Sequence, residues 1–149
     1  MAEVWFYQLE RTGLAQALPE LLEKTLAKKW KAVVRAARRE RVEPLDGWLW
    51  PWRDDSFLPH AVEGQPDLER QPVVLTVGQG NPNGAEALFL VDGAEPGNLE
   101  GYERCVILFD GADETAMAQA RERWKALKRG GAAVSYWKQS GRGGWEKQA

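Results

Sequence analysis

The sequence predicts an α/β fold: a single domain whose central sheet is mostly parallel or mixed and is covered by helices. Segments with strand-like composition alternate with segments whose apolar residues recur at helical spacing. Several of the predicted strands are apolar throughout, which is typical of strands covered on both faces of a sheet. A chain of 149 residues suits one such domain. We assign residues 1–138 to it and expect residues 139–149 to form a disordered C-terminal tail.

The first elements are a strand, a helix, a second strand and a short helix. Aromatic and β-branched residues predict a strand at 4–9. Leucines at helical spacing predict a helix between residues 14 and 30. Pro19 is expected in about the first turn of that helix, where its missing N–H costs little. Residues 32–36 predict the second strand, and residues 40–50 predict the short helix.

An irregular stretch follows as far as about residue 71, and three strands come after it. They are predicted at 73–77, 87–91 and 105–109, and the first and last are continuous apolar runs. Residues 78–84 are rich in glycine and asparagine, which favours a turn or loop. We interpret this loop as a wide hairpin connection between the strands on either side of it.

The last predicted helix, residues 114–129, has clear start and stop signals. Asp113 is a favourable N-cap, and Gly130-Gly131 ends the helix. Acidic residues lie near the positive end of the helix dipole and basic residues near the negative end. A short strand at 134–137 completes the domain.

The formal net charge of −2 hides an uneven distribution along the chain. Residues 1–114 hold 12 basic and 20 acidic side chains, a balance of −8, whereas residues 115–149 hold 8 basic and 2 acidic, a balance of +6. The excess positive charge of this C-terminal region must be stabilised by solvent, by the C-terminal end of a helix or by an anionic partner.

Composition excludes several classes of site. One cysteine excludes an internal disulfide and a multi-cysteine zinc site, and one histidine excludes most histidine-based metal sites. We therefore expect no metal and no cofactor. No run approaches the roughly 20 apolar residues of a membrane span, and the N-terminus lacks the basic and apolar regions of a signal peptide. A cytoplasmic protein without membrane contacts is the expectation.

The motifs of nucleotide-binding folds are incomplete. The loop at 78–84 has glycines but no Lys-Ser/Thr pair, and it leads to a strand rather than a helix. The dinucleotide motif fails because Gly13 is alone after the first strand. The sequence therefore contains no complete phosphate-binding loop.

Candidate catalytic residues each have an ordinary structural explanation. Cys105 lies inside an apolar strand, as a buried and inert thiol would. His60 lies in irregular chain and is interpreted as a structural or interface residue. Asp110 and Asp113 follow a strand, where α/β enzymes place catalytic acids, but helix capping accounts for them. We therefore expect no catalytic activity.

Two features favour binding instead. Aromatic residues crowd the segment around Trp50 and Phe57, and they are either plugs beneath a loop or anchors of an interface. The helix at 114–129 carries an apolar row beside a basic row, and Trp124 lies where the two rows meet. Such a cleft suits a peptide with several acids and a C-terminal carboxylate. An ordinary solvated face and a nucleic-acid surface are the alternatives.

Three blocks resemble the chi subunit family of bacterial DNA polymerase III. They are Leu45-Asp46 … Leu49-Trp50 … Ser56-Phe57-Leu58-Pro59-His60, then Arg121-Glu122-Arg123-Trp124-Lys125, and finally Tyr136-Trp137-Lys138. The resemblance implies a non-catalytic subunit associated with the clamp loader, on a three-layer α/β/α fold that resembles nucleotide-binding folds without their phosphate loop. It implies a heterodimer with the psi subunit and binding of the acidic C-terminal tail of single-stranded DNA-binding protein. Contact with DNA is then indirect, and no small-molecule substrate is expected.

The resemblance assigns residues to both partners. For psi it implies Trp50 and Phe57 as contacts, with Pro59 and His60 shaping the same block. For the acidic tail it implies Arg121 as the anion-binding residue, Trp124 as the aromatic residue and Lys125 as a neighbouring base. The predicted tail-binding residues are Met117, Arg121, Trp124, Lys125 and Lys128. Met117 stands where some relatives have lysine, so Lys128 or Arg129 is expected to supply the missing charge.

Two other functions remain open on the residues alone. One is a nucleotide-dependent enzyme on a P-loop-like fold, and the other is direct binding of single-stranded DNA by the basic helix. The negative total charge argues against the second.

Overall fold

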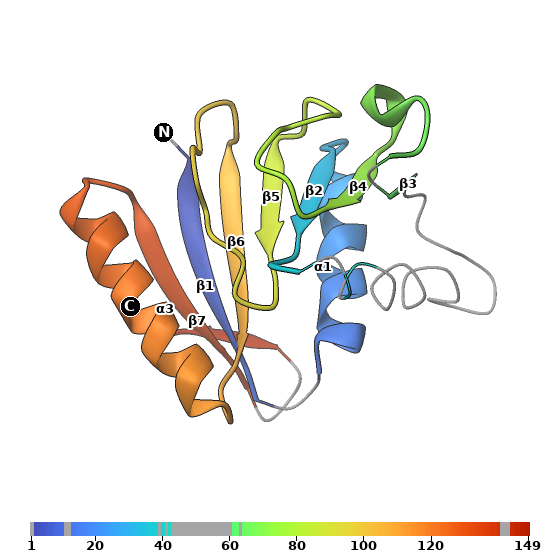
Figure 1. Cartoon of the computed structure of the whole chain (residues 1–149). Coiled ribbons are helices and arrows are strands. Elements are labelled where there is room, and N and C mark those ends of the chain that lie inside the picture. The colour runs from blue at the N-terminus through green and yellow to red at the C-terminus, as the bar shows by residue number, and fades with distance from the viewer. Residues whose placement is uncertain are drawn as a thin grey trace.

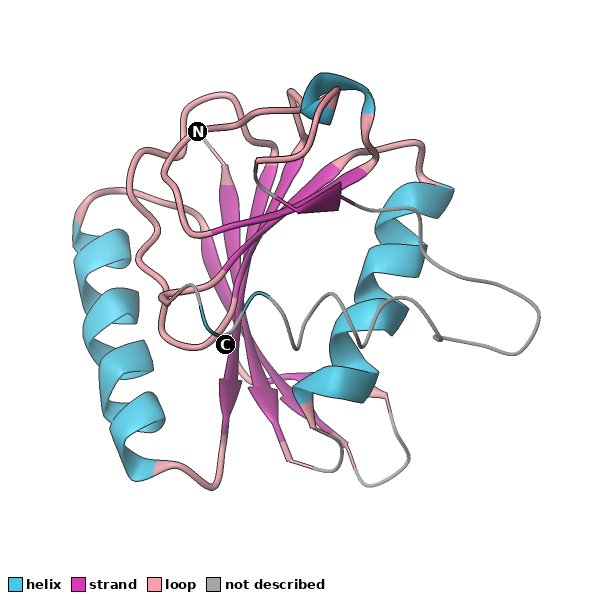
Figure 2. Ribbon diagram, turned by 45° about the vertical axis from the view of Figure 1, so that its right-hand side comes forward, coloured by secondary structure: helices cyan, strands magenta, loops and turns pink. Residues whose placement is uncertain are grey.

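A helix covers each face of a central β-sheet, and the two helices lie on opposite sides (Figures 1 and 2). The computed structural model describes residues 2–10, 13–38, 40, 42, 61–62, 64–140 and 144–149. The helices are α1 (Leu14–Ala27) and α3 (Glu114–Arg129), with a 3-10 helix, η2, at Leu68–Arg70. The strands are β1 (Glu3–Leu9), β2 (Ala32–Arg35), β3 (Ala61–Val62), β4 (Val73–Thr76), β5 (Ala87–Leu90), β6 (Arg104–Asp110), β7 (Val134–Gln139) and β8 (Trp145–Lys147). The predicted three-layer α/β/α fold is confirmed.

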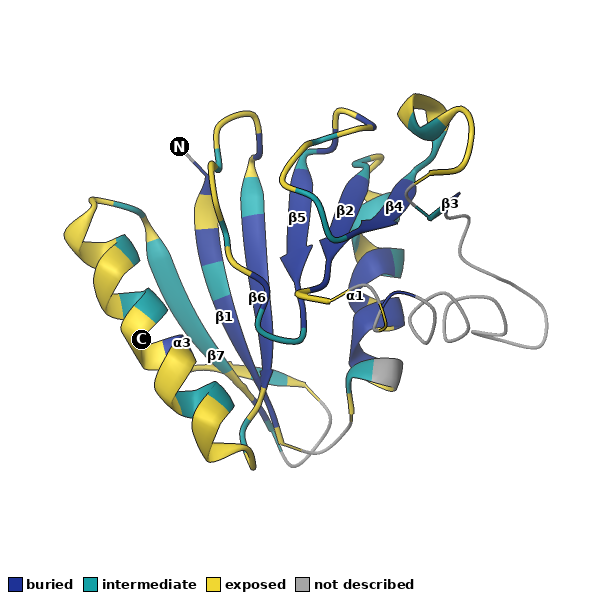
Figure 3. Cartoon of the chain, in the orientation of Figure 1, coloured by how far each residue is buried: buried dark blue, intermediate teal, exposed yellow. Residues whose placement is uncertain are grey.

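Within the described residues the sheet has eight strands in the order β3-β4-β2-β5-β6-β1-β7-β8. Every neighbouring pair is parallel except β7 and β8, which are antiparallel. The sheet is therefore mixed but mostly parallel, as predicted. Strands β2, β4 and β5 are buried along their whole length (Figure 3), in agreement with their continuous apolar sequences.

The apolar side chains form two cores, one on each face of the sheet. Alternation along β1 divides its residues, so that Phe6 belongs to the core beneath α3 and Tyr7 to the core beneath α1. Leu18 and Leu22 of α1 are fully buried in the second core, and burial of each contributes about 1.5–3 kcal/mol. Trp5 and Trp30 are half-buried at the margin of this core.

The N-terminal helix begins at Leu14, after Gly13 as N-cap, so Pro19 lies in its second turn rather than its first. Pro19 is buried there, and its missing N–H removes one intrahelical bond. The predicted helix at 40–50 lies mostly outside the described residues. The short elements β3 and η2 were not predicted, because two or three residues show no periodicity.

The hairpin predicted between the strands at 73–77 and 87–91 is wrong. Strands β4 and β5 lie on either side of β2, and both run parallel to it. The connecting chain therefore crosses β2 without a helix. The buried Asn83 holds this crossing by donating from Nδ2 to the carbonyl oxygens of Ala32 at 3.2 Å and Gln71 at 2.9 Å. An apolar strand sequence indicates burial but not direction.

The predicted disordered tail contains ordered structure. Gln139 is buried and completes β7, and Trp145–Lys147 form β8 against it. The ring of Trp145 stacks on Tyr7 with centroids 4.4 Å apart. This contact buries part of a large aromatic side chain and offsets the entropic cost of ordering Trp145–Lys147.

Candidate functional site

The candidate site lies on α3, whose ends are fixed as predicted. Oδ1 of Asp113 accepts hydrogen bonds from the backbone N–H groups of Thr115 at 2.9 Å and Ala116 at 3.2 Å. An N-cap of this kind stabilises a helix by about 1 kcal/mol. The helix then runs over Glu114–Arg129, the predicted range, to a C-cap at Gly130.

Trp124 is held against the sheet by two aromatic rings. Its ring meets Phe6 of β1 edge to face, with centroids 5.5 Å apart, and Tyr136 of β7 in the same way at 6.1 Å. Such arrangements are favourable for aromatic quadrupoles. Trp124 remains half-buried, so part of its surface is available to a ligand.

A pocket of about 260 Å³ lies beside this ring. It is lined by Met117, Ala120, Arg121, Trp124, Lys125, Tyr136 and Ala149. The structure thus brings together four of the five residues predicted for the peptide tail. Lys128 does not line the pocket, but its Nζ lies 5.8 Å from the centre of the Trp124 ring.

The cationic side chains beside the pocket are exposed and form few or weak ion pairs within the described residues. Arg121 makes no hydrogen bond or ion pair within the described part of the chain. Nζ of Lys125 lies 3.7 Å from Oε1 of Glu122, and an exposed pair of this kind contributes about 0–1 kcal/mol. Lys128 and Arg129 are exposed in the last turn of α3. These charges can therefore pair with an anion at little cost to the fold.

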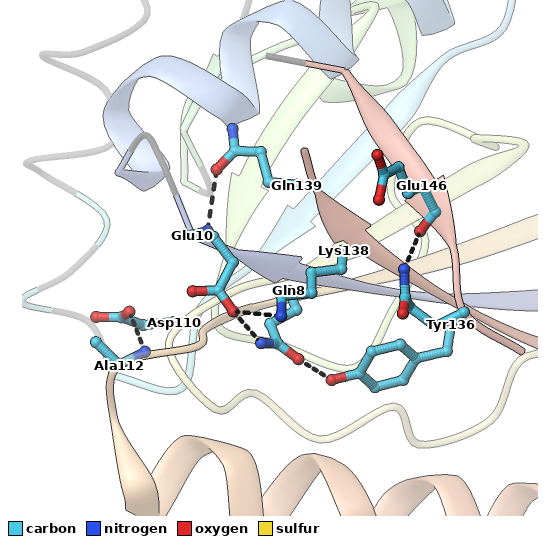
Figure 4. A network of polar contacts seen from close by, with 9 residues as sticks. Gln8, Glu10, Asp110, Ala112, Tyr136, Lys138, Gln139 and Glu146 are labelled. Atoms are coloured by element: carbon cyan, nitrogen blue, oxygen red, sulfur yellow. Dashed lines mark hydrogen bonds and ion pairs between the residues drawn. The ribbon is translucent and has the colours of Figure 1, made fainter. Parts of the chain in front are cut away.

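Tyr136 forms the floor of the pocket and is fixed by a polar network (Figure 4). Its hydroxyl donates to Oε1 of Gln8, and Nε2 of Gln8 donates to Oε1 of Glu10. Nζ of Lys138 lies 3.7 Å from the same Glu10 oxygen. Burial raises the pKa of Tyr136, the Glu10 carboxylate raises it further, and the Arg121 cation lowers it. The tyrosine is therefore a neutral hydrogen-bond donor at physiological pH.

A larger pocket of about 740 Å³ lies at the carboxyl ends of β1, β5 and β6, where parallel sheets commonly bind ligands. Three of its polar side chains make hydrogen bonds within the fold. Asp113 caps α3, as predicted, whereas Oδ1 of Asp110 accepts from the N–H of Ala112 at 2.9 Å in the turn before the helix and does not cap it. Arg123 donates to the carbonyl oxygens of Ala94 at 2.7 Å and Gly93 at 2.8 Å. Burial lowers the pKa of Arg123.

The lone cysteine is buried, as predicted. Cys105 has no exposed surface, and burial raises the pKa of its thiol to about 12. It therefore carries no thiolate at neutral pH, and the thiolate is the form that reacts as a nucleophile.

The residues predicted to contact psi lie outside the described residues. They are Trp50, Phe57, Pro59 and His60. Among the described residues, no group of three or more histidine, cysteine or acidic side chains could hold a metal ion. No helix there is long and apolar enough to cross a membrane.

Sequence reasoning missed two of the residues that line the small pocket. Tyr136 comes from a strand that pairs with β1, and Ala149 comes from the segment expected to be disordered. Tyr136 did occur in the third block of the resemblance, which was its only signal. No local pattern in the sequence indicates that Ala149 reaches α3.

Comparison with known proteins supports the resemblance. Residues 1–135 match the model of the family described as DNA polymerase III chi subunit, HolC. The chain belongs to this family. It is 27% identical over 135 residues to DNA polymerase III subunit chi of Pseudomonas aeruginosa, covering 88% of this chain and 92% of that protein.

A second relative is matched over a shorter region. The chain is 26% identical over 91 residues to the probable DNA polymerase III subunit chi of Rickettsia prowazekii, covering 61% of this chain. The match spans 55% of the length of that relative. Membership of the family supports a role in DNA replication as an accessory subunit of DNA polymerase III.

Proposed function

We propose that this chain is a non-catalytic subunit, associated with the clamp loader of DNA polymerase III, that binds two proteins. Its α3 pocket binds the acidic C-terminal tail of single-stranded DNA-binding protein. Its aromatic segment around Trp50 and Phe57 binds the psi subunit. The two contacts together connect the replicase to template coated with the single-stranded DNA-binding protein.

The observation that carries the proposal for the tail is an unpaired arginine at the rim of an apolar pocket. Arg121 makes no hydrogen bond or ion pair to another described residue, and Trp124 lies one helical turn along on the same wall. The guanidinium can bind a terminal carboxylate with two parallel hydrogen bonds. An aromatic side chain of the peptide can pack between Trp124 and Met117.

The remaining cations fit the acidic residues that precede such a terminus. Lys125, Lys128 and Arg129 are exposed along the same helix and attract carboxylates through solvent. Met117 supplies apolar surface to the pocket instead of a charge. So short a peptide, held by exposed charges and one side chain, is expected to bind with a roughly micromolar Kd that rises with salt.

Calorimetric titration with a synthetic acidic peptide ending in phenylalanine tests this site. Arg121→Ala is expected to weaken binding about tenfold or more, because a hydrogen bond between charged groups contributes about 1.5–3 kcal/mol. Lys24→Ala removes the same charge from an exposed position on α1 and should leave the affinity unchanged. Equal affinities of the Arg121 variant and the intact chain would exclude the assignment.

The psi contact rests on the family and on the aromatic composition of its segment. Large aromatic side chains dominate the energy of most protein interfaces. Phe57→Ala is expected to abolish co-elution with psi in size-exclusion chromatography and to leave the peptide affinity unchanged. Normal co-elution of this variant would contradict the assignment.

The two other functions have their own tests. Micromolar binding of naked single-stranded DNA, lost in Lys128→Ala, would favour direct DNA binding. An increase in Tm with ATP or a dinucleotide would favour a nucleotide-dependent enzyme.

A further inference from the structure

Residues 145–149, called here the C-terminal strap, follow the edge of β7 as far as Tyr136. Strand β8 pairs antiparallel with β7 over its three residues. Beyond β8, the N–H of Gln148 donates to the Tyr136 carbonyl oxygen at 2.7 Å, and the N–H of Tyr136 donates to the Ala149 oxygen at 3.1 Å. Two strap residues therefore oppose one residue of β7, as in a β-bulge.

This arrangement brings Ala149 to the pocket on α3. Ala149 lines the 260 Å³ pocket together with Arg121 and Trp124. The pocket therefore has α3 as one wall, Tyr136 as its floor and the end of the strap as a second wall.

We propose that Gln148 and Ala149, the last two residues of the strap, are part of the peptide site and set the size of its side-chain pocket. The proposal rests on the proposed binding of an acidic peptide at Arg121. The strap closes the pocket on the side away from α3, so that one large apolar side chain of the peptide fits while its carboxylate reaches the arginine. The methyl group of Ala149 leaves this space open, and a larger side chain at that position would fill it.

The strap is anchored independently of the pocket. Trp145 stacks on Tyr7 in the core beneath α1, on the opposite face of the sheet. The N–H of Ser140 donates to the Gly144 carbonyl oxygen at 2.7 Å, which holds the start of the strap close to the end of β7. Gln148 and Ala149 can therefore be removed while β8 and its aromatic contact stay in place.

Two variants of the full chain test the strap, with the phenylalanine-ending acidic peptide as the probe in calorimetry. Deletion of Gln148 and Ala149 is expected to weaken binding roughly fivefold, because the bound side chain loses apolar contact on one side. Ala149→Trp is expected to weaken it more than tenfold by filling the pocket. Lys147→Trp adds the same bulk opposite Trp137, on the face away from the pocket, and should bind the peptide normally.

The outcomes separate this inference from the proposed function. If the deletion leaves the affinity unchanged or increases it, the strap is not a wall; an increase would mean that it competes with the peptide. If Arg121→Ala abolishes binding while both strap variants bind normally, the tail site stands and the strap inference falls. If the intact chain does not bind the peptide, both fail. Circular dichroism and Tm of each variant establish that it is folded.

Discussion

Two arginines of α3, two positions apart, face different pockets. Arg123 lines the 740 Å³ pocket, and its guanidinium is occupied by the carbonyl oxygens of Gly93 and Ala94. Arg121 lines the 260 Å³ pocket and, among the described residues, has no hydrogen-bond or ion-pair partner. The larger pocket lies where parallel sheets usually bind ligands, yet its arginine, Arg123, is already occupied by backbone carbonyl oxygens. Unpaired charge beside fixed apolar surface therefore indicates a binding site better than volume does.

The largest effect is expected from Arg123→Ala. The variant leaves two carbonyl oxygens of the loop after β5 without their donor, and hydrogen bonds to a charged group contribute about 1.5–3 kcal/mol. We expect the free energy of unfolding to fall by about 2–3 kcal/mol in chemical denaturation, with peptide affinity preserved in the folded protein. Arg121→Ala is the matched variant and should change stability by less than about 0.5 kcal/mol. If Arg121→Ala lowered stability more than Arg123→Ala did, the different roles given to the two arginines would be wrong.

A smaller effect is expected from Arg121→Lys. Lysine keeps the positive charge but loses the planar pair of donors that binds a carboxylate with two hydrogen bonds. The peptide affinity should fall severalfold, less than in Arg121→Ala. If lysine restores full affinity, the arginine acts only as a point charge, and the bidentate geometry proposed for it is wrong.

The smallest effect concerns the floor of the pocket. The Arg121 cation lowers the pKa of Tyr136, whereas burial and Glu10 raise it. Arg121→Ala should therefore raise the pKa of Tyr136 further, and its ionisation should occur at higher pH. Titration of tyrosinate absorbance in the intact chain and the variant measures the difference, with Tyr136→Phe identifying the relevant transition. An unchanged titration would mean that solvent screens the two groups from each other.

The separation in sequence between interacting residues decides which features of the fold and site could be predicted. Helix α3, its N-cap at Asp113 and the pairing of Arg121 with Trp124 on one wall all depend on residues three or four positions apart, so spacing alone predicts them. The position of Tyr136 depends on pairing between β1 and β7, residues more than 120 positions apart. The position of Ala149 depends in turn on its backbone hydrogen bonds to Tyr136 of β7. No local pattern carries that information.

The same limit explains the error between β4 and β5. Their apolar sequences correctly indicated burial, but the direction of each strand depends on β2, which lies between them. Asn83 fixes this crossing through hydrogen bonds to residues 51 and 12 positions away. A loop rich in glycine and asparagine is compatible with either connection, so its composition could not decide between them.

The position of β8 against β7 has a consequence for the outer edge of the sheet. Without β8, the outer edge of β7 would offer a six-residue row of unpaired backbone groups beside the aromatic residues Tyr136 and Trp137, a template for adding a strand from another molecule. Strand β8 covers that edge and replaces it with three residues, of which Glu146 and Lys147 are charged and exposed. A short, charged edge strand is a poor template for aggregation. Strand β8 therefore makes this edge of the sheet less prone to self-association.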